Sequence, residues 1–197
     1  MQLLRGRGFG VMNLINFLYG AAALGFGALV PLYAQDRFGM PILQAGTLLT
    51  ARAIGMICVA GLAVLALRRT GYRLPMIVGF LVIAVGLVAM AFTPPTVSPY
   101  LWLSITGAVT GIGMGFSVPA SNNATMQLAR DQLAGIAGLR GMFRQSGAIM
   151  GVSITTAFLA RSTNPGDTLG IAFVVFAVIL VCVLPLVMLV PEHRGSW

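Results

Sequence analysis

Charged residues are scarce in this sequence, at 8% of 197 residues, whereas soluble domains carry roughly 25%. A soluble fold of this size could not cover its surface with so few charges. Hydrophobic residues make up 58% of the chain, which also excludes a disordered polypeptide, because disorder requires low hydrophobicity. These counts indicate a protein that crosses a lipid bilayer several times.

Acidic residues are scarcer still, and we expect all four to lie in loops or in the tail: Asp36, Asp131, Asp167 and Glu192. The one histidine, His193, also lies in the tail. Proton relays inside membranes use Asp, Glu or His within the spans, so no proton-coupling site is expected here. Clustered metal ligands and a histidine near a serine are missing too, so we expect no metal site, no cofactor and no enzyme.

Lysine is absent, and the net charge of +8 comes from twelve arginines set against the four acids. In membrane proteins positive charge marks cytoplasmic loops, so we expect no nucleic-acid partner. The two cysteines, Cys58 and Cys182, lie within apolar runs. We interpret them as small buried hydrophobic residues, not as a disulfide or a metal site.

Apolar stretches of about 20 residues, long enough to cross a bilayer, recur along the whole chain. The predicted spans are 9–33, 43–67, 75–92, 100–118, 133–159 and 169–190. The connections between them are short and rich in helix-breaking residues. The sequence therefore predicts an all-α integral membrane protein with six transmembrane helices in the lipid bilayer.

The arginines also predict the orientation, because cytoplasmic loops are enriched in positive charge. If the N-terminus is cytoplasmic, nine arginines fall on that side and two, Arg37 and Arg161, on the outer side. The cytoplasmic set is Arg5, Arg7, Arg68, Arg69, Arg73, Arg130, Arg140, Arg144 and Arg194. We therefore expect a multi-pass protein of the plasma (inner) membrane with both termini in the cytoplasm.

The distribution of polar residues indicates an internal repeat. Spans one, two, four and five carry polar residues, whereas spans three and six carry almost none. Residues 25–31 match residues 113–119, and the same offset of 88 carries Arg52 onto Arg140. Three spans reverse the chain direction across the membrane, so the second copy would be inverted. We expect one domain of two inverted three-helix repeats, at about 9–92 and 100–190.

Arg52 is the sharpest candidate for a functional residue. It lies nine residues after Leu43, about 13 Å into the second span at 1.5 Å per residue. A bare arginine at that depth costs at least about 2.5–3.5 kcal/mol, so we expect it to face protein or water. It is either a substrate or gating contact, or an arginine satisfied by carbonyls between helices.

Other polar residues of the spans allow a similar pair of interpretations. Asn13 and Asn16, on the first span with Tyr19, share a helix face and either bind substrate or hydrogen-bond a neighbouring helix. On the fifth span, Gln145 either lines a cavity with Arg144, or Arg144 snorkels to the interface. The candidate substrate-cavity residues are Arg52, Asn13, Asn16, Tyr19, Thr106, Thr110, Arg144 and Gln145.

Two groups of residues carry a family resemblance. The first is Pro31-Leu32-Tyr33-Ala34-Gln35, Ala45-Gly46 and Arg52-Ala53-Ile54-Gly55. The second is Gly111-Ile112-Gly113-Met114-Gly115, Pro119, Asn123, Met126, Gly135, Gly138, Arg144-Gln145, Gly147 and Gly151-Val152-Ser153-Ile154. With these residues the chain resembles the C-terminal six-helix half of a major facilitator superfamily drug:proton antiporter of the fourteen-span type.

The resemblance implies two six-helix halves around a central cavity, which export amphipathic compounds against proton entry. It also implies that the third and sixth helices of each half are peripheral. The acidic coupling residues of the family lie largely in the N-terminal half, which we expect to be absent from this chain. Arg68 stands where the family's cytoplasmic loop has an acid, which puts a charge-pair gate at this loop in doubt.

We therefore expect one half of a multidrug-type exporter that acts on a small-molecule substrate. It would need an N-terminal six-helix half or a second copy, and the proton gradient would drive the complete transporter. The alternative is a non-transporting membrane partner of another carrier, or an inactive fragment.

Overall fold

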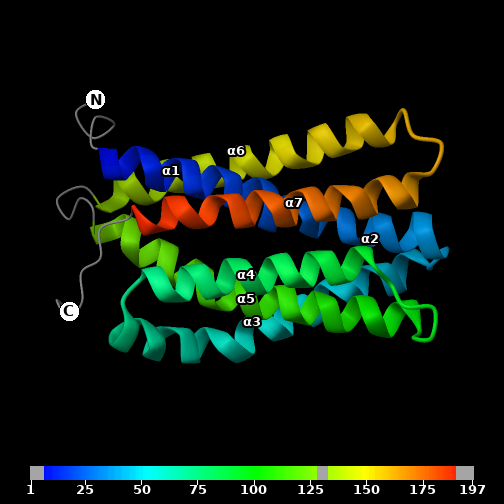
Figure 1. Cartoon of the computed structure of the whole chain (residues 1–197), viewed down its shortest axis with the longest axis horizontal. Helices are drawn as coiled ribbons and strands as arrows, with labels where there is room; N and C mark the ends of the chain where they lie inside the picture. Colours follow the sequence, from blue (N-terminus) through cyan, green and yellow to red (C-terminus); the bar gives the residue numbers. More distant parts are fainter. Residues whose placement is uncertain (1–6, 128–132, 190–197) are drawn as a thin grey trace.

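The computed structural model describes residues 7–127 and 133–189, and this part of the chain contains helices and short connections but no strand. In chain order the helices are α1 (Arg7–Tyr19), the π-helical segment η2 (Gly20–Leu24), α2 (Gly25–Phe38), α3 (Ile42–Thr70), α4 (Arg73–Ala91), α5 (Pro99–Gln127), α6 (Leu133–Leu159) and α7 (Pro165–Met188). Their axes run roughly along one direction, and α1 begins at the end of the bundle where α7 ends (Figure 1).

Five segments of the described chain are long and apolar enough to cross a bilayer. One of them, Gly10–Phe38, comprises most of α1 with η2 and α2, and the others lie in α3, α4, α5 and α7. The remaining helix, α6, has 27 residues and runs along the same direction (Figure 1), but it carries Arg140 and Arg144. The prediction of an all-helical membrane protein is confirmed.

Several predicted boundaries are wrong. The fourth span is predicted to end at residue 118, whereas α5 continues to Gln127. The first span continues past Tyr33 as part of α2, so Asp36 is helical rather than in a loop. Asp167 lies in the first turn of α7, where Pro165 occupies a position that favours proline because no backbone donor is needed there. Gly39 ends α2 at a φ of +62°, a conformation that glycine adopts without steric cost.

The two cysteines also differ from the prediction, because Cys58 and Cys182 are free and exposed rather than buried. Apolar side chains of a membrane helix are surrounded by hydrocarbon, so they need no burial within the protein. Several predictions concern residues outside the described ranges: Arg5, Arg130, Asp131, Glu192, His193 and Arg194. The side chains of Arg7, Arg68 and Arg69 are likewise not described.

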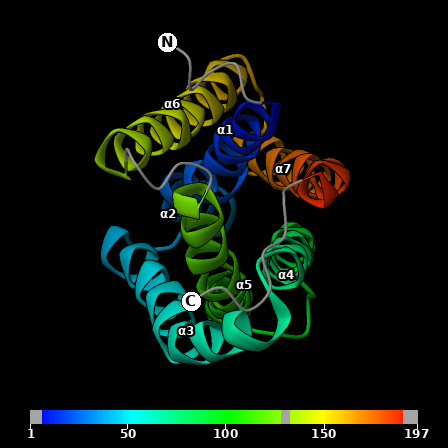
Figure 2. The same ribbon diagram turned by 90° about the vertical axis from the view of Figure 1, so that its left-hand side faces the viewer.

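The packing divides the bundle into two sides. α5 packs on α3 and α4, the first span packs on α6 and α7, and α4 packs on α7. If spans one to three trade places with spans four to six, the same set of helix contacts results. An inverted repeat has this pattern of contacts. Figure 2 shows α3 and α6 on the side of the bundle away from α4 and α7.

Glycines allow the closest of these contacts. A Cβ atom at Gly111 of α5 would overlap the backbone carbonyl of Arg52 in α3. A Cβ atom at Gly147 of α6 would overlap the backbone carbonyl of Phe17 in α1. Small residues at helix crossings let backbones approach and gain van der Waals contact, which drives helix association in lipid.

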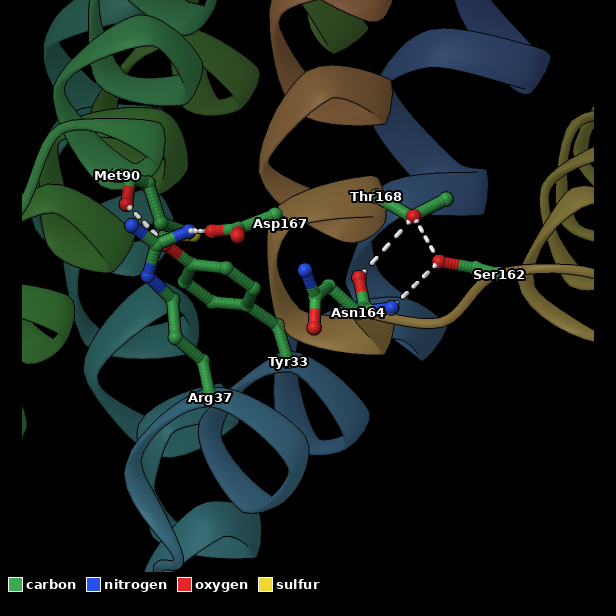
Figure 3. Close-up of polar contacts among 7 residues, drawn as sticks. All are labelled: Tyr33, Arg37, Met90, Ser162, Asn164, Asp167 and Thr168. Carbon is green, nitrogen blue, oxygen red and sulfur yellow. Dashed lines mark hydrogen bonds and ion pairs between the residues drawn. The ribbon is translucent and has the colours of Figure 1, made fainter.

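Arg37 and Tyr33 together join three spans (Figure 3). Its Nη1 donates to Asp167 Oδ1 of α7 at 2.7 Å. Its guanidinium carbon lies 5.7 Å from the ring centroid of Tyr33 and 5.9 Å from that of Phe38. The Tyr33 hydroxyl donates to the Met90 carbonyl of α4 at 3.2 Å. The arginine and the tyrosine therefore tie α2 to both α7 and α4.

Substitutions can separate the ion pair of Arg37 from its contacts with the two aromatic rings. Asp167→Asn removes the ion pair, which is partly exposed to solvent, and we expect a loss of about 0.2–1 kcal/mol. Arg37→Ala also removes the two ring contacts, which adds roughly 0.5–1 kcal/mol. Thermal unfolding of the purified variants measures both losses. Equal melting temperatures of the two variants would show that the rings contribute nothing.

Candidate functional site

Arg52 lies at the seam between α3 and the first span. Its guanidinium carbon is 5.6 Å from the ring centroid of Phe26, which is a cation–π distance. A Cβ atom at Gly27 would overlap the guanidinium, so the absence of a side chain there makes room for it. Nη1 is buried and has no hydrogen-bond partner among the described residues. Arg52 can therefore donate to an acceptor group that reaches this seam.

Tyr19 belongs to the same region. Its hydroxyl accepts a hydrogen bond from Ser117 Oγ of α5 at 3.3 Å. Its ring stacks on Phe80 of α4, with the ring centroids 5.2 Å apart. Among the described charged groups, Arg52 and Arg144 lie within electrostatic range of its hydroxyl. The structure thus brings three of the candidate residues, from three helices, toward one place.

The helix changes from α to π geometry directly after Tyr19. A Cβ atom at Gly20, the first residue of η2, would overlap the backbone carbonyl of Arg144 in α6. A Cβ atom at Gly25 would lie 3.3 Å from the Ala148 carbonyl oxygen. The π-helical segment thus lies against α6, and such segments are frequent at functional sites. The π-helical segment is not among the predicted features, and its one signal in the sequence is the run of a glycine and three alanines.

Asn16 and Asn13 have different surroundings. Asn16 Nδ2 donates to the Met12 carbonyl at 2.7 Å, and its Oδ1 accepts from Ser121 Oγ of α5 at 3.1 Å. Asn13 is 3% exposed, and within the described chain neither of its side-chain polar atoms has a partner. Asn16 therefore bonds a neighbouring helix, whereas Asn13 keeps its full hydrogen-bonding capacity.

Thr106 and Thr110 are buried where α5 packs on α4. Their hydroxyls donate to carbonyls of their own helix, Trp102 at 2.8 Å and Gly107 at 2.7 Å. A Cβ atom at Gly86 of α4 would overlap the Thr110 side chain. The structure does not bring these threonines together with Arg52.

On α6, Arg144 is half-buried and Gln145 is exposed. Arg140, one turn earlier, is 9% exposed, and its Nη1 donates to Asn122 Oδ1 of α5. This interhelical pair is not among the predicted site residues. The internal repeat, whose offset carries Arg52 onto Arg140, is the sequence signal that indicates Arg140.

In the described ranges, no three His, Cys, Asp or Glu side chains come together as metal ligands would. The two acids described, Asp36 and Asp167, lie in the terminal turns of α2 and α7. The polar groups that remain for binding in the spans are thus guanidinium, amide and hydroxyl groups. They donate hydrogen bonds to neutral or anionic acceptors.

Comparison with known proteins gives a family match over most of the chain. A model described as Major Facilitator Superfamily matches residues 12–197. Multidrug transporter protein MdtP of Bacillus subtilis is 27% identical over 166 residues, which cover 83% of this chain and 30% of MdtP. Methylenomycin A resistance protein of Streptomyces coelicolor is 30% identical over 168 residues, 84% of this chain and 35% of that protein. The chain spans about a third of the length of these curated relatives.

Among solved structures, the inward open xylose transporter XylE from E. coli resembles this chain, with a TM-score of 0.68 at 21% identity. The similarity covers 94% of this chain and 48% of XylE. It shows that the two proteins share a fold.

The difference between Asn13 and Asn16 is testable by stability. Asn13→Leu removes two buried polar atoms that lack partners, so we expect the free energy of unfolding to rise by about 1 kcal/mol. Asn16→Leu leaves Ser121 without its acceptor, and we expect a fall of similar size. The melting temperatures of the two matched variants show whether each substitution raises or lowers the stability. A clear fall for Asn13→Leu would contradict the assignment of Asn13 as unpartnered.

Proposed function

Because this chain belongs to the Major Facilitator Superfamily, we propose that it forms part of a transporter that exports small amphipathic molecules across the plasma membrane. The family comprises transporters rather than enzymes. Two relatives are named for multidrug transport and for methylenomycin A resistance, which supports this substrate class.

The buried end of the half-buried Arg52 side chain is the observation that carries the proposal. Its Nη1 has no hydrogen-bond partner in the described part of the chain, and a buried charged donor without a partner is costly in a membrane protein. An acceptor atom of a passing substrate would satisfy it. We assign Arg52, with Tyr19 and Arg144 in range, to the polar end of the substrate site.

The wall of the proposed cavity is the side of the bundle that holds α3 and α6 (Figure 2). Exposed polar side chains lie on both helices, including Thr50 of α3 and Gln145 and Ser153 of α6. On the opposite side, α4 and α7 expose apolar residues such as Val85 and Ile171. Polar residues of a span face a bundle interior or water, so this side is suited to a cavity and the other to lipid.

A six-helix unit encloses such a cavity only with a second unit. The similarity to XylE covers nearly all of this chain but 48% of the other, which supports a role as one half. We propose that the second unit is an N-terminal six-helix half or a second copy of this chain. We place proton coupling in that unit, since the acids described here lie at helix ends.

The arginine distribution supports an orientation with both termini in the cytoplasm. A non-transporting membrane partner of another carrier is the alternative function. Reconstitution of the chain into vesicles, alone and with a candidate N-terminal half, separates the two. Gradient-driven flux of a dye in either preparation supports transport, and its absence in both supports the alternative.

Substitution of Arg52 tests the site within an assembled, active transporter. Arg52→Gln removes the charge and leaves an amide donor on a shorter side chain, and hydrogen bonds to charged groups contribute about 1.5–3 kcal/mol. We therefore expect the export rate at low substrate concentration to fall by about tenfold or more. Arg52→Lys keeps the charge and should retain part of the rate. Unchanged export of several substrates by Arg52→Gln, at normal protein abundance, would remove Arg52 from the site.

A further inference from the structure

A cavity of about 550 Å³ lies between α1, α6 and α7, and its volume falls in the roughly 300–1,000 Å³ range of small-molecule sites. Phe17 of α1, Phe158 of α6 and Phe176 of α7 contribute to its lining. Arg52 and the asparagines of α1 are not part of it. It is therefore separate from the proposed substrate site.

The polar lining residues, Thr155 and Thr168, offer no free hydrogen bond donor. The Thr155 hydroxyl donates to the Gly151 carbonyl of its own helix at 2.8 Å. The Thr168 hydroxyl donates to the Asn164 carbonyl at 3.1 Å and lies 2.5 Å from Ser162 Oγ (Figure 3). Because both hydroxyl protons are used within the protein, the cavity offers almost only apolar contacts. A hydrocarbon chain fits this lining, whereas a polar ligand would lose its hydration without compensation.

The rim of the cavity is apolar and exposed on both sides. Ile154 and Phe158 form it on α6, and Ile171 on α7. The helix α7 is peripheral and exposes apolar residues along its length, including Val178 and Val181. The cavity therefore opens toward the hydrocarbon of the bilayer, so the molecules at its mouth are lipids.

A positive charge lies at one end of this cavity. Arg161 occupies the turn between α6 and α7, and its backbone amide donates to the carbonyl of the lining residue Phe158 at 3.1 Å. Its side chain is exposed, and no ion pair involves it in the described chain. Guanidinium groups bind phosphate through charge-assisted hydrogen bonds. We propose that the cavity binds one acyl chain of a phospholipid whose phosphate pairs with Arg161.

Lipid binding to the purified full chain tests this proposal. Native mass spectrometry would measure retention of two probes with the same acyl chains, phosphatidylglycerol and diacylglycerol. Ala172 lines the cavity on α7, so Ala172→Phe fills it. Ala157 of α6 is exposed and outside the lining, so Ala157→Phe is the matched control. Ala172→Leu, a smaller change, replaces Ala172→Phe if that variant does not fold.

We expect Ala172→Phe to weaken binding of both probes by at least about tenfold, and Ala157→Phe to leave it unchanged. Arg161→Gln should weaken phosphatidylglycerol by about three- to tenfold, the effect of one arginine near a lipid surface, and leave diacylglycerol unchanged. Equal retention by Ala172→Phe and the control would overturn the proposal. Saturable binding of rhodamine 6G that Ala172→Phe abolishes, with lipid retention unchanged, would also overturn it and assign the cavity to a substrate.

Discussion

Close approach of helix backbones is the constraint on which this bundle depends. Lipid tails are as apolar as side chains, so membrane helices associate through van der Waals packing rather than by removing apolar surface from water. α5 reaches α3 at Gly111, and α6 reaches the first span at Gly147 and at Gly20. The same contacts bring Arg52 and Arg144 within electrostatic range of Tyr19.

The two sides of the bundle suit different surroundings. α4 and α7 pack on each other and expose apolar residues, whereas α3 and α6 also expose polar ones. Between them, Asn16 and Ser121 join α1 to α5, and Arg140 joins α6 to Asn122 of α5. The interior polar groups thus connect the helices, and a few of them, such as Nη1 of Arg52, have no hydrogen-bond partner in the described chain.

The helical fold was predictable because the hydropathy of each residue is known from the sequence, and because only a few backbone structures can span a bilayer. The end of the first span was not predictable, because Asp36 and Arg37 are charged residues of the kind that usually occurs in loops. The partner of Arg37 is Asp167, 130 residues later, and its rings are those of Tyr33 and Phe38. A contact so distant in sequence leaves no local pattern.

Of the candidate site, the sequence by itself determined which polar groups enter the spans and, through helical periodicity, which of them share a face. Only the tertiary structure decided which of them find partners. Asn13 and Asn16 lie on one face, yet Asn16 meets Ser121 and Asn13 meets no partner in the described chain. The physical reason is that periodicity fixes the direction of a side chain, whereas the group it meets depends on how closely another helix approaches.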